Sequence, residues 1–584
     1  MTRFACDLTL GAQLIAEDQT RFRIWAPAQD QVSVEIEGRP ALAMHSVGDG
    51  IFELEAACGA GARYRYRMSD DLAVPDPASR AQADDVHGAS LVVDPRAYDW
   101  RTPDWAGRPW EETVLYEVHA GVLGGFNGVA MRLPELKALG VTAIELMPIA
   151  DFPGKRNWGY DGVLPYAPDA AYGTPDELKA LVDRAHELGL SIFLDVVYNH
   201  FGPDGNYLNA YAPAVFNEDV HTPWGAAIDF RRPQVRDYYT QNALYWVQEY
   251  RFDGLRFDAV HAISPQDWLT EMAQAVRAAV GPDRHVHLVL ENEHNTASHL
   301  AGPFDAQWND DFHNVLHVLL TDETGAYYQD FADRPAERLA RCLAEGFIYQ
   351  GDPSPNHDGA PRGERSGDLP PTAFVSFLQN HDQVGNRALG DRLISLAEPP
   401  ALRAATALLL LAPQIPMLFM GEETGSTTPF LFFTDFHDEL ADAVREGRRK
   451  EFAKFSEFSD PEKRKRIPDP NAAETFERSK PQPGPDADTW RAFYTELLAL
   501  RRERIIPGLR GAHALGAEAV GEKAVFARWR LGDGAVLSLA VNLGPEASAL
   551  PQAPTTTPIY SVGDDGSPAA QTPYSLTAWL ESAS

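Results

Sequence analysis

Cysteine is scarce in this chain: its 584 residues include three, Cys6, Cys58 and Cys342. An odd number of widely separated cysteines is neither a disulfide framework nor a metal-ligand pattern. We therefore expect free thiols and a reducing, cytoplasmic location. Residues Met1–Gln19 carry acidic side chains and lack the apolar core behind a basic start that marks a secretory signal, so no such signal is expected.

Long apolar runs and basic residues are also few. The most apolar stretch, Ala404–Met420, is interrupted by Pro413 and Pro416 and is too short to span a bilayer. Against 84 Asp and Glu stand 51 Lys and Arg, which gives a formal net charge of -33. Because such a chain repels phosphate backbones and anionic lipids, we expect neither nucleic acid nor a membrane as a partner.

Alternation of polar and apolar residues is the main pattern of the N-terminal region. It occurs over Arg21–Trp25, Val32–Ile36 and Arg63–Arg67, with Gly and Pro between these segments. Such alternation is typical of half-buried β-strands. We predict a β-sandwich over residues 1–95, followed by a linker rich in Pro and Trp over residues 96–110.

Short apolar runs then alternate with helical patterns, which is typical of β/α units around a parallel sheet. One helix is predicted over Thr174–Leu188, where Pro175 suits the first turn and Gly189 ends the helix. Eight apolar runs are expected as strands, the number that closes a (β/α)8 barrel of the α/β class. These runs are Val114–Val118, Ala143–Met147, Ile192–Val197, Gly254–Phe257, Val286–Leu290, Phe304–Trp308, Phe374–Leu378 and Met417–Met420. We assign the barrel with its insertions to residues 111–505.

Two segments within the barrel region differ in composition from the rest. Gly351–Pro371 is rich in Gly and Pro, and Arg445–Arg466 is dense in alternating charge. We interpret both as exposed loop or helix, with a wall of the substrate cleft as the alternative. Residues 506–584 are predicted to form a C-terminal β domain, because two apolar segments flank the turn Gly532-Asp533-Gly534 as in a hairpin.

Charged residues and histidines follow four of the predicted strands. They are Asp195 and His200 after the third strand, Arg256 and Asp258 at the fourth, Glu291 after the fifth, and His381 and Asp382 after the seventh. A single carboxylate in such a position is usually a helix cap or an ion-pair partner. Together, however, these side chains mark the carboxyl ends of barrel strands, where barrel enzymes do their chemistry.

With Trp158-Gly159-Tyr160-Asp161 upstream, these segments resemble the conserved regions of the α-amylase family of glycoside hydrolases, from about residue 110 to 490. The resemblance also implies that the predicted N-terminal β-sandwich is similar to a starch-binding domain. It implies hydrolysis with retention, with Asp258 as the nucleophile and Glu291 as the general acid and base. Asp382 is implied as the third carboxylate, which grips sugar hydroxyls, and Arg256 as the group that keeps Asp258 ionised and oriented.

The same resemblance implies a set of substrate-binding residues. His200 and His381 match the pair that hydrogen-bonds the sugar on the non-reducing side of the cut, and Tyr160 matches the aromatic platform beneath it. Asp195 is expected to orient the site through hydrogen bonds, with a purely structural carboxylate as the alternative.

The general acid has one competing assignment. Glu293 lies on the same face of an extended segment as Glu291, so the register alone allows either residue. We prefer Glu291 because it directly follows the apolar strand. No acidic cluster with calcium-loop spacing accompanies these motifs, so neither a metal nor another cofactor is expected.

Four further segments resemble the subfamily that cleaves trehalose from maltooligosyltrehalose. They are Trp308–His313, Gln379–Arg387, Phe433–Phe436 and Thr475–Lys480. The resemblance implies hydrolysis of the α-1,4 bond next to the terminal trehalose, with maltooligosyltrehalose and related α-glucans as partners. The groups that read trehalose are expected within Trp308–His313, Gln383–Arg387 and Phe433–Phe436.

Two alternatives to this function are a glycogen branching enzyme, or another α-1,4-glucan hydrolase or transferase, and a glucan-binding protein without activity. The complete set of Asp258, Glu291 and Asp382 argues against the last, because a binding module has no need of all three. No oligomeric state is predicted.

Overall fold

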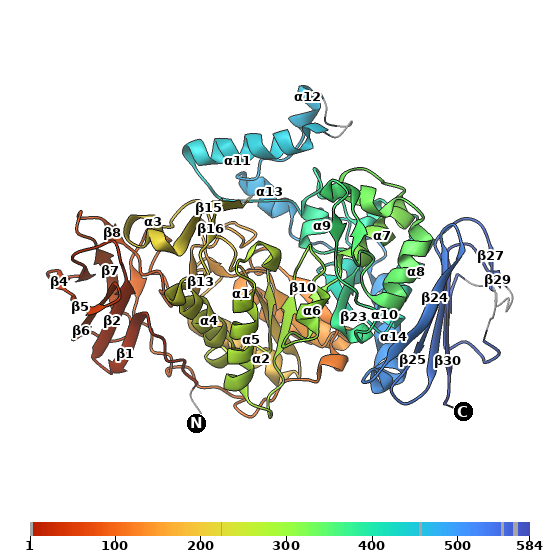
Figure 1. Ribbon diagram of the computed structural model, residues 1–584, viewed down its shortest axis with the longest axis horizontal. Helices are drawn as coiled ribbons and strands as arrows, with labels where there is room; N and C mark the ends of the chain where they lie inside the picture. Colours follow the sequence, from red (N-terminus) through yellow and green to blue (C-terminus); the bar gives the residue numbers. More distant parts are fainter. Residues whose placement is uncertain are drawn as a thin grey trace.

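The computed structural model describes residues 4–222, 225–454, 458, 460–550, 554–563 and 570–583. N-terminal strands lie at one end of the molecule, a closed barrel in the middle and C-terminal strands at the other end (Figure 1). None of the helices within the described ranges is long and apolar enough to cross a membrane. The closed barrel between two groups of β-strands confirms the predicted fold class. The predicted domain boundaries stay a prediction.

The N-terminal strands form two antiparallel sheets. One has the order β1 (Gly11–Ala16), β2 (Gln19–Trp25), β6 (Ile51–Ala56) and β5 (His45–Gly48); the other has β4 (Leu42–Ala43), β3 (Ser33–Ile36), β7 (Arg63–Arg67) and β8 (Ala73–Val74), with β9 (Ser90–Leu91) beside β7. The alternation predicted for β2 and β7 is confirmed, because Phe22, Tyr64 and Tyr66 are buried between half-exposed arginines.

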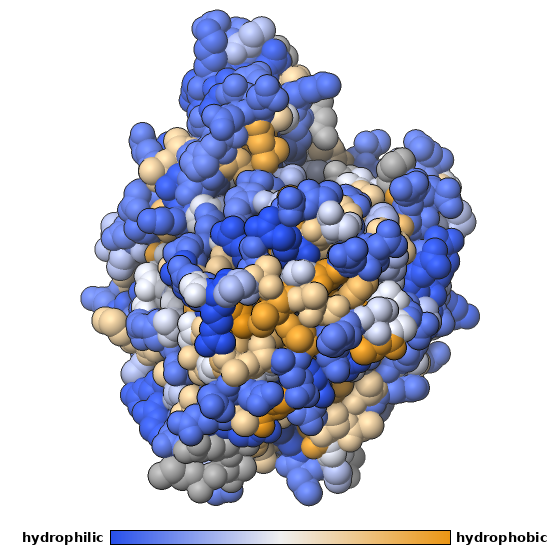
Figure 2. All heavy atoms as spheres, turned by 90° about the vertical axis from the view of Figure 1, so that its left-hand side faces the viewer, coloured by the Kyte–Doolittle hydropathy of each residue, from blue (hydrophilic) through white to orange (hydrophobic). Residues whose placement is uncertain are grey.

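Figure 2 faces this end of the molecule and shows apolar residues gathered near the middle of a mostly polar surface. On the N-terminal strands, the large apolar side chains that are exposed are Ile15, Leu42 and Val47. None of the three is aromatic. Among the described residues of this region, an exposed aromatic platform for stacking a glucan ring is therefore absent.

The barrel is closed by eight parallel strands, as predicted. In order they are β10 (Leu115–Val118), β11 (Ala143–Leu146), β14 (Ser191–Val196), β17 (Gly254–Phe257), β18 (His287–Leu290), β19 (Ala306–Trp308), β22 (Phe374–Phe377) and β23 (Ile415–Phe419). Every residue of these strands is buried, because side chains face either the barrel interior or the surrounding helices. This burial on both faces explains why the strands appear in the sequence as continuous apolar runs.

The helices around the barrel include α1 (Gly125–Leu139), α2 (Pro175–Glu187), α4 (Pro233–Gln248), α5 (Asp267–Val280), α7 (Asp310–Thr321), α8 (Pro335–Glu345), α10 (Pro399–Leu411) and α14 (Ala487–Leu500). The predicted helix at Thr174–Leu188 is confirmed as α2. The Thr174 side chain accepts a hydrogen bond from the Glu177 backbone, and the Glu177 carboxylate accepts from the Thr174 backbone. Gly189 follows the helix with a φ of 74°, a left-handed conformation that suits glycine.

The charged insertion forms α11 (Asp438–Glu451) and α12 (Pro461–Arg464), which stand out from the barrel in Figure 1. Residues 455–457 and 459 of this insertion lie outside the described residues. Its buried side chains Phe452, Phe458 and Ile467 pack against Ala388 and Leu389 of the barrel. The prediction of an exposed helix is therefore incomplete, because one side of the insertion covers a barrel loop.

The C-terminal sheet has the order β24 (His513–Gly521), β25 (Ala524–Arg530), β26 (Val536–Asn542), β30 (Ser575–Glu581) and β28 (Tyr560–Val562). The predicted hairpin is confirmed, since β25 and β26 pair antiparallel on either side of Gly532-Asp533-Gly534. The sheet packs on the barrel: the Trp529 indole donates a hydrogen bond of 3.1 Å to the backbone oxygen of Leu343 in α8.

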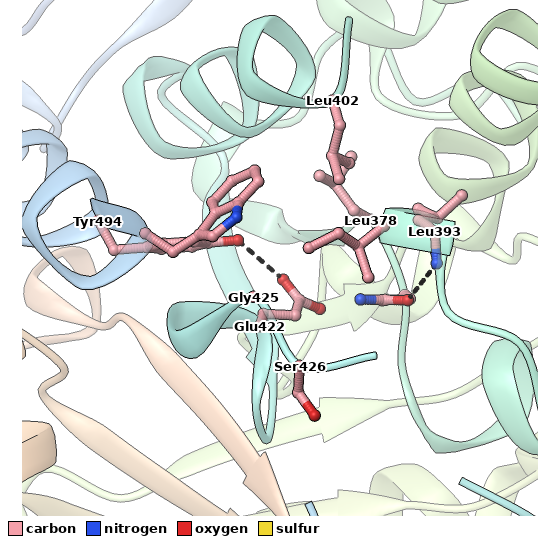
Figure 3. A pocket seen from close by; sticks show the side chains of 10 residues that line it. Leu378, Leu393, Leu402, Glu422, Gly425, Ser426 and Tyr494 are labelled. Atoms are coloured by element: carbon pink, nitrogen blue, oxygen red, sulfur yellow. Dashed lines mark hydrogen bonds between the residues drawn. The ribbon is translucent and has the colours of Figure 1, made fainter. Parts of the chain in front are cut away.

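A small pocket lies beside the ends of β22 and β23, against α14 (Figure 3). Its polar groups are paired within the protein: the Tyr494 hydroxyl donates to Glu422 at 3.4 Å, and the Leu393 backbone donates to Gln379 at 3.1 Å. Burial raises the pKa of Glu422 to about 8. The first bond joins α14 to the segment after β23, and the second joins Leu393 to the segment after β22, which carries His381 and Asp382.

Candidate active site

A buried arginine lies at the centre of the barrel's carboxyl end. The Arg256 guanidinium is inaccessible to solvent, and its Nη1 atom donates to Asp258 Oδ1 at 2.6 Å and to Asp195 Oδ2 at 2.8 Å. The guanidinium also lies over the Trp308 ring, 4.1 Å from its centroid. Because two carboxylates share one donor atom, the orientation of Asp258 is fixed from strands β14 and β17 together.

Glu291 follows β18 and meets the same guanidinium from its other side. Its Oε2 atom accepts a hydrogen bond of 2.7 Å from the Ala259 backbone and lies 3.9 Å from Arg256 Nη2. Burial raises the pKa of Glu291; the Arg256 charge opposes this shift and the Asp258 charge adds to it. A carboxyl group with a raised pKa beside an oriented carboxylate is the pair that glycoside hydrolysis requires.

The side chain of Glu293, the competing candidate for the acid, lies outside the group of side chains around Arg256. It is 55% exposed, with carboxylate oxygens 3.8 Å from His261 Nε2 and 3.5 Å from His357 Nε2. His357 comes from the insertion rich in Gly and Pro, so part of that insertion reaches the catalytic face. Of the two glutamates, Glu291 is the one beside Arg256, and its side chain is 17% exposed, so the geometry favours Glu291 as the acid.

His381 and Asp382 lie in α9 (His381–Gly385), directly after β22. His381 Nδ1 donates to Glu117 Oε1 at 2.5 Å, its backbone nitrogen donates to Glu117 Oε2 at 3.0 Å, and its Nε2 lies 3.5 Å from Asp382 Oδ1. Burial alone would lower the pKa of His381, but the Asp382 and Glu117 carboxylates raise it to about 9. At neutral pH this side chain is therefore an imidazolium.

Tyr160 and His200 complete the same face. The Tyr160 hydroxyl donates to Asp195 Oδ2 at 2.6 Å, and its ring stacks on His381 with the centroids 5.0 Å apart. His200 Nε2 lies 2.8 Å from the Tyr160 backbone oxygen. The turn before Tyr160 needs glycine, because Gly159 has a φ of 103° and a Cβ there would lie 2.1 Å from the Pro148 oxygen.

The eight residues named from the sequence thus lie around one guanidinium and one imidazolium. Two carboxyl groups at the same face were missed: Glu117 and Glu145. Glu117 and Glu145 lie within apolar strands, and a carboxylate inside such a run was the signal available. Glu145 is inaccessible to solvent, neither of its carboxyl oxygens has a hydrogen-bond partner within the described part of the chain, and burial raises its pKa well above the usual range.

The segments expected to read trehalose are mostly buried. Within Trp308–His313, Asp310 is the half-exposed residue; it accepts a hydrogen bond of 3.3 Å from Gln383, and burial with the nearby charges of Glu291 and Asp382 raises its pKa to about 8. In Phe433–Phe436, by contrast, Phe433 and its neighbour Thr434 are inaccessible to solvent. The Phe433 ring packs in the core, edge-on to neighbouring aromatic rings, and the role expected of the segment stays a prediction.

Among the residues that the structure describes, no three His, Cys, Asp or Glu side chains are placed to hold a metal ion. The candidate site therefore consists of carboxyl groups, one guanidinium, imidazoles and aromatic rings.

Comparison with known proteins bears on this arrangement. The family described as "Alpha amylase, catalytic domain" matches residues 81–219, and a domain family of unknown function, DUF3459, matches residues 512–579. A malto-oligosyltrehalose trehalohydrolase of Deinococcus radiodurans is 44% identical over 510 residues, which cover 83% of this chain and 81% of that protein. The enzyme of the same name from Saccharolobus solfataricus is 40% identical over 85% of this chain and 87% of its own length.

The chain belongs to the malto-oligosyltrehalose trehalohydrolase family. A branching enzyme of Jannaschia sp. is 36% identical over only 46% of this chain and 42% of its own length, so the trehalohydrolases match far more of the sequence. A crystal structure from Salmonella typhimurium, of a protein assigned to the α-amylases, superposes with a TM-score of 0.92 at 46% identity, covering 98% of this chain and 100% of that one. A pullulanase from Anoxybacillus sp. LM18-11, complexed with maltotetraose, shares the fold with a TM-score of 0.72 at 18% identity; the alignment covers 99% of this chain and 88% of that one.

Proposed function

We propose that this protein hydrolyses the α-1,4-glucosidic bond next to the terminal trehalose of maltooligosyltrehalose and releases trehalose. The observation that carries the proposal is similarity to malto-oligosyltrehalose trehalohydrolases over more than four-fifths of the chain, together with the carboxyl groups of Asp258, Glu291 and Asp382 at one end of the barrel. Its substrates are maltooligosyltrehalose and related α-glucans.

In the first step, Asp258 attacks the anomeric carbon while Glu291 gives its proton to the glycosidic oxygen of the leaving trehalose. Arg256 orients the Asp258 carboxylate through a hydrogen bond, and burial raises the pKa of Glu291, which favours the protonated form that a general acid needs. The carbon–oxygen bond to trehalose breaks as the bond to the Asp258 carboxylate forms, which leaves a glycosyl-enzyme ester.

In the second step, the Glu291 carboxylate takes a proton from water, and the water oxygen attacks the anomeric carbon. The ester bond to Asp258 breaks, and the maltooligosaccharide leaves with its new anomeric hydroxyl in the α configuration, because two inversions restore the original one. Glu291 regains its proton and the site returns to its starting state.

The imidazolium of His381 is placed to bind the sugar in both steps. Its Nε2 atom is buried and has no hydrogen-bond partner among the described residues, so its proton is available to a sugar hydroxyl. The half-exposed Asp382 carboxylate, 46% accessible, lies beside it as an acceptor. A donor and an acceptor side by side suit a sugar hydroxyl, which both accepts and donates.

We also place the enzyme in the cytoplasm. All three cysteines are buried free thiols, as a reducing compartment would leave them.

Product analysis tests the proposed function. The purified protein is given maltooligosyltrehalose and, separately, maltooligosaccharides and amylose, and the products are separated by chromatography. Trehalose and a shortened maltooligosaccharide are expected from the first substrate. α-1,6 branches formed from amylose would instead establish the branching alternative, and no change in any substrate would leave only glucan binding.

A further inference from the structure

Asp382 is oriented by a side chain that lies one helical turn further along the chain. Asn386 Nδ2 donates to Asp382 Oδ1 at 3.1 Å. That bond occupies one carboxylate oxygen with a donor from the protein and leaves the other for the sugar. Because the side-chain amide of Asn386 is an acceptor at one end and a donor at the other, a 180° flip would place its oxygen against the carboxylate.

The orientation of that amide is set by Arg448, which comes from helix α11 of the charged insertion. Arg448 Nη1 lies 3.4 Å from Asn386 Oδ1, and Arg448 Nη2 donates to the Gly385 backbone oxygen at 2.5 Å. A guanidinium carries donors only, so it pairs with the amide oxygen and turns the amide nitrogen toward Asp382. Arg448 and Asp382 therefore favour the same orientation of the Asn386 amide, and Arg448 anchors its oxygen end.

Arg448 is itself held firmly. Its side chain is 9% exposed, its guanidinium is 4.7 Å from the ring centroid of Phe452 and 5.3 Å from that of Phe432, and it pairs with Glu451 at 3.0 Å. A guanidinium fixed on several sides loses little further freedom when it binds Asn386. The insertion's apolar side chains also pack on the segment that follows Asn386, so this helix is anchored there by two separate contacts.

We propose that Arg448 is a positioning residue for trehalose release: from helix α11 it fixes the Asn386 amide, which in turn fixes the Asp382 carboxylate. This inference rests on the proposed function and extends the site to an insertion that lies outside the barrel strands. It assigns the charged insertion a role in the reaction, beyond forming a wall of the cleft.

Arg448→Ala is the variant that tests this proposal, and Arg449→Ala is its matched control. Arg449 is the next residue on the same helix and pairs with Glu446 within that helix at 2.8 Å, so both variants remove one positive charge from α11. With maltooligosyltrehalose, we expect Arg448→Ala to lower kcat about 10-fold with a smaller change in KM, because a misoriented Asp382 impairs the transition state more than ground-state binding. Arg449→Ala should stay within about 2-fold of the wild type.

A double-mutant cycle separates positioning from general support of the fold. If Arg448 acts through Asn386, then Asn386→Ala and Arg448→Ala should each lower kcat about 10-fold, and the double variant should lose little more. Arg448→Lys, which keeps the charge, should recover part of the lost kcat.

The result that overturns the inference is a set of fully multiplicative losses in the cycle, or an Arg448→Ala variant as active as the Arg449→Ala control. The wild-type assay run alongside keeps the two proposals apart: if the wild type itself releases no trehalose, the proposed function fails first.

Discussion

For single side chains, the decisive feature is that one guanidinium contacts three carboxyl groups. Arg256 donates hydrogen bonds to Asp258 and Asp195, and its Nη2 atom lies 3.9 Å from Glu291 Oε2. Its bond to Asp258 fixes that anion, whereas at Glu291 the charge only opposes a pKa that burial raises. These different surroundings support the roles proposed for the two carboxyl groups, nucleophile for Asp258 and acid for Glu291.

The first prediction tests the roles proposed for Asp258 and Glu291 against the nearby Glu293. Asp258→Asn and Glu291→Gln each keep the side chain's shape and remove its charge, so we expect kcat to fall at least about a thousandfold with the fold intact. Glu293→Gln is the matched control and should keep near wild-type turnover, because Glu293 is exposed and lies away from Arg256. Steady-state kinetics with circular dichroism as a check of folding decides it. If Glu291→Gln kept wild-type turnover and Glu293→Gln lost it, the general acid would be Glu293 and not Glu291.

The second prediction concerns the buried pair of Glu117 and His381. The pKa of His381 is about 9 in the folded protein against 6.5 in a free peptide, so the charged form stabilises the fold. Because the pKa is raised, this stabilisation is complete below about pH 6.5 and is lost as the pH rises through about 9. Glu117→Gln removes one of the charges that raise this pKa.

We therefore expect Glu117→Gln to unfold at a clearly lower temperature than the wild type near pH 6, and the gap to narrow as the pH approaches 10. Differential scanning calorimetry at several pH values measures it. A gap that stayed constant across this range would show that Glu117 does not stabilise the fold through the charge on His381.

Among strands and helices, the barrel was the most predictable part. Its strands are buried on both faces and appear as apolar runs, and each predicted run overlaps an observed strand. The residues that follow these strands could be grouped in advance because parallel strands end at one face. Such patterns involve residues that are close together in the sequence, so they can be detected without knowledge of the structure.

Contacts between distant segments could not be predicted in this way. Glu117 meets His381 across 264 positions, and Arg448 meets Asn386 across 62 positions. The spacing of residues in the sequence does not reveal such partners. Glu117 was therefore assigned only to an apolar strand, and Arg448 only to an exposed charged helix. The packing of Phe433 could not be predicted for the same reason, since the rings that contact it, those of His119 and Phe476, come from elsewhere in the chain.

The third prediction concerns helix α2. Thr174→Ala removes the side-chain acceptor of the capping box, so the unfolding free energy should fall by about 1 kcal/mol while kcat stays unchanged. Thr495→Ala serves as a control, because the Thr495 hydroxyl bonds back to the Arg491 oxygen inside α14 and caps no helix end. Urea denaturation measures both variants. An equal effect of the two substitutions would refute a specific role for the cap.

For the molecule as a unit, the fourth prediction is the stereochemistry and metal independence of the reaction. Asp258 and Glu291 meet the same guanidinium, an arrangement that suits double displacement, so the freed maltooligosaccharide should appear first as its α anomer. A proton NMR time course shows which anomer forms. Activity should also survive a chelator. Initial release of the β anomer would refute the covalent mechanism, and loss of activity in the chelator would refute metal independence.

Substrate choice follows from the same site. Trehalose has no free anomeric hydroxyl and bends differently at its linkage, so polar groups placed for it would stay unpaired with a maltose unit, at a cost of about 1 to 3 kcal/mol for each buried group. Asp310 and Gln383 are half-buried polar residues of the expected segments; they form a hydrogen bond of 3.3 Å, and burial with the charges of Glu291 and Asp382 raises the pKa of Asp310. We expect them to contribute to this discrimination.

The most direct measurement is the ratio of kcat/KM for a maltooligosyltrehalose to that for the reducing maltooligosaccharide with the same number of glucose rings. Two unpaired groups at the cost given above correspond to a ratio of at least about 30 in favour of the trehalose-capped chain. We predict a ratio of that size or larger, with trehalose as the released product. A ratio near one would contradict trehalose-specific hydrolysis and leave a general α-1,4-glucan hydrolase.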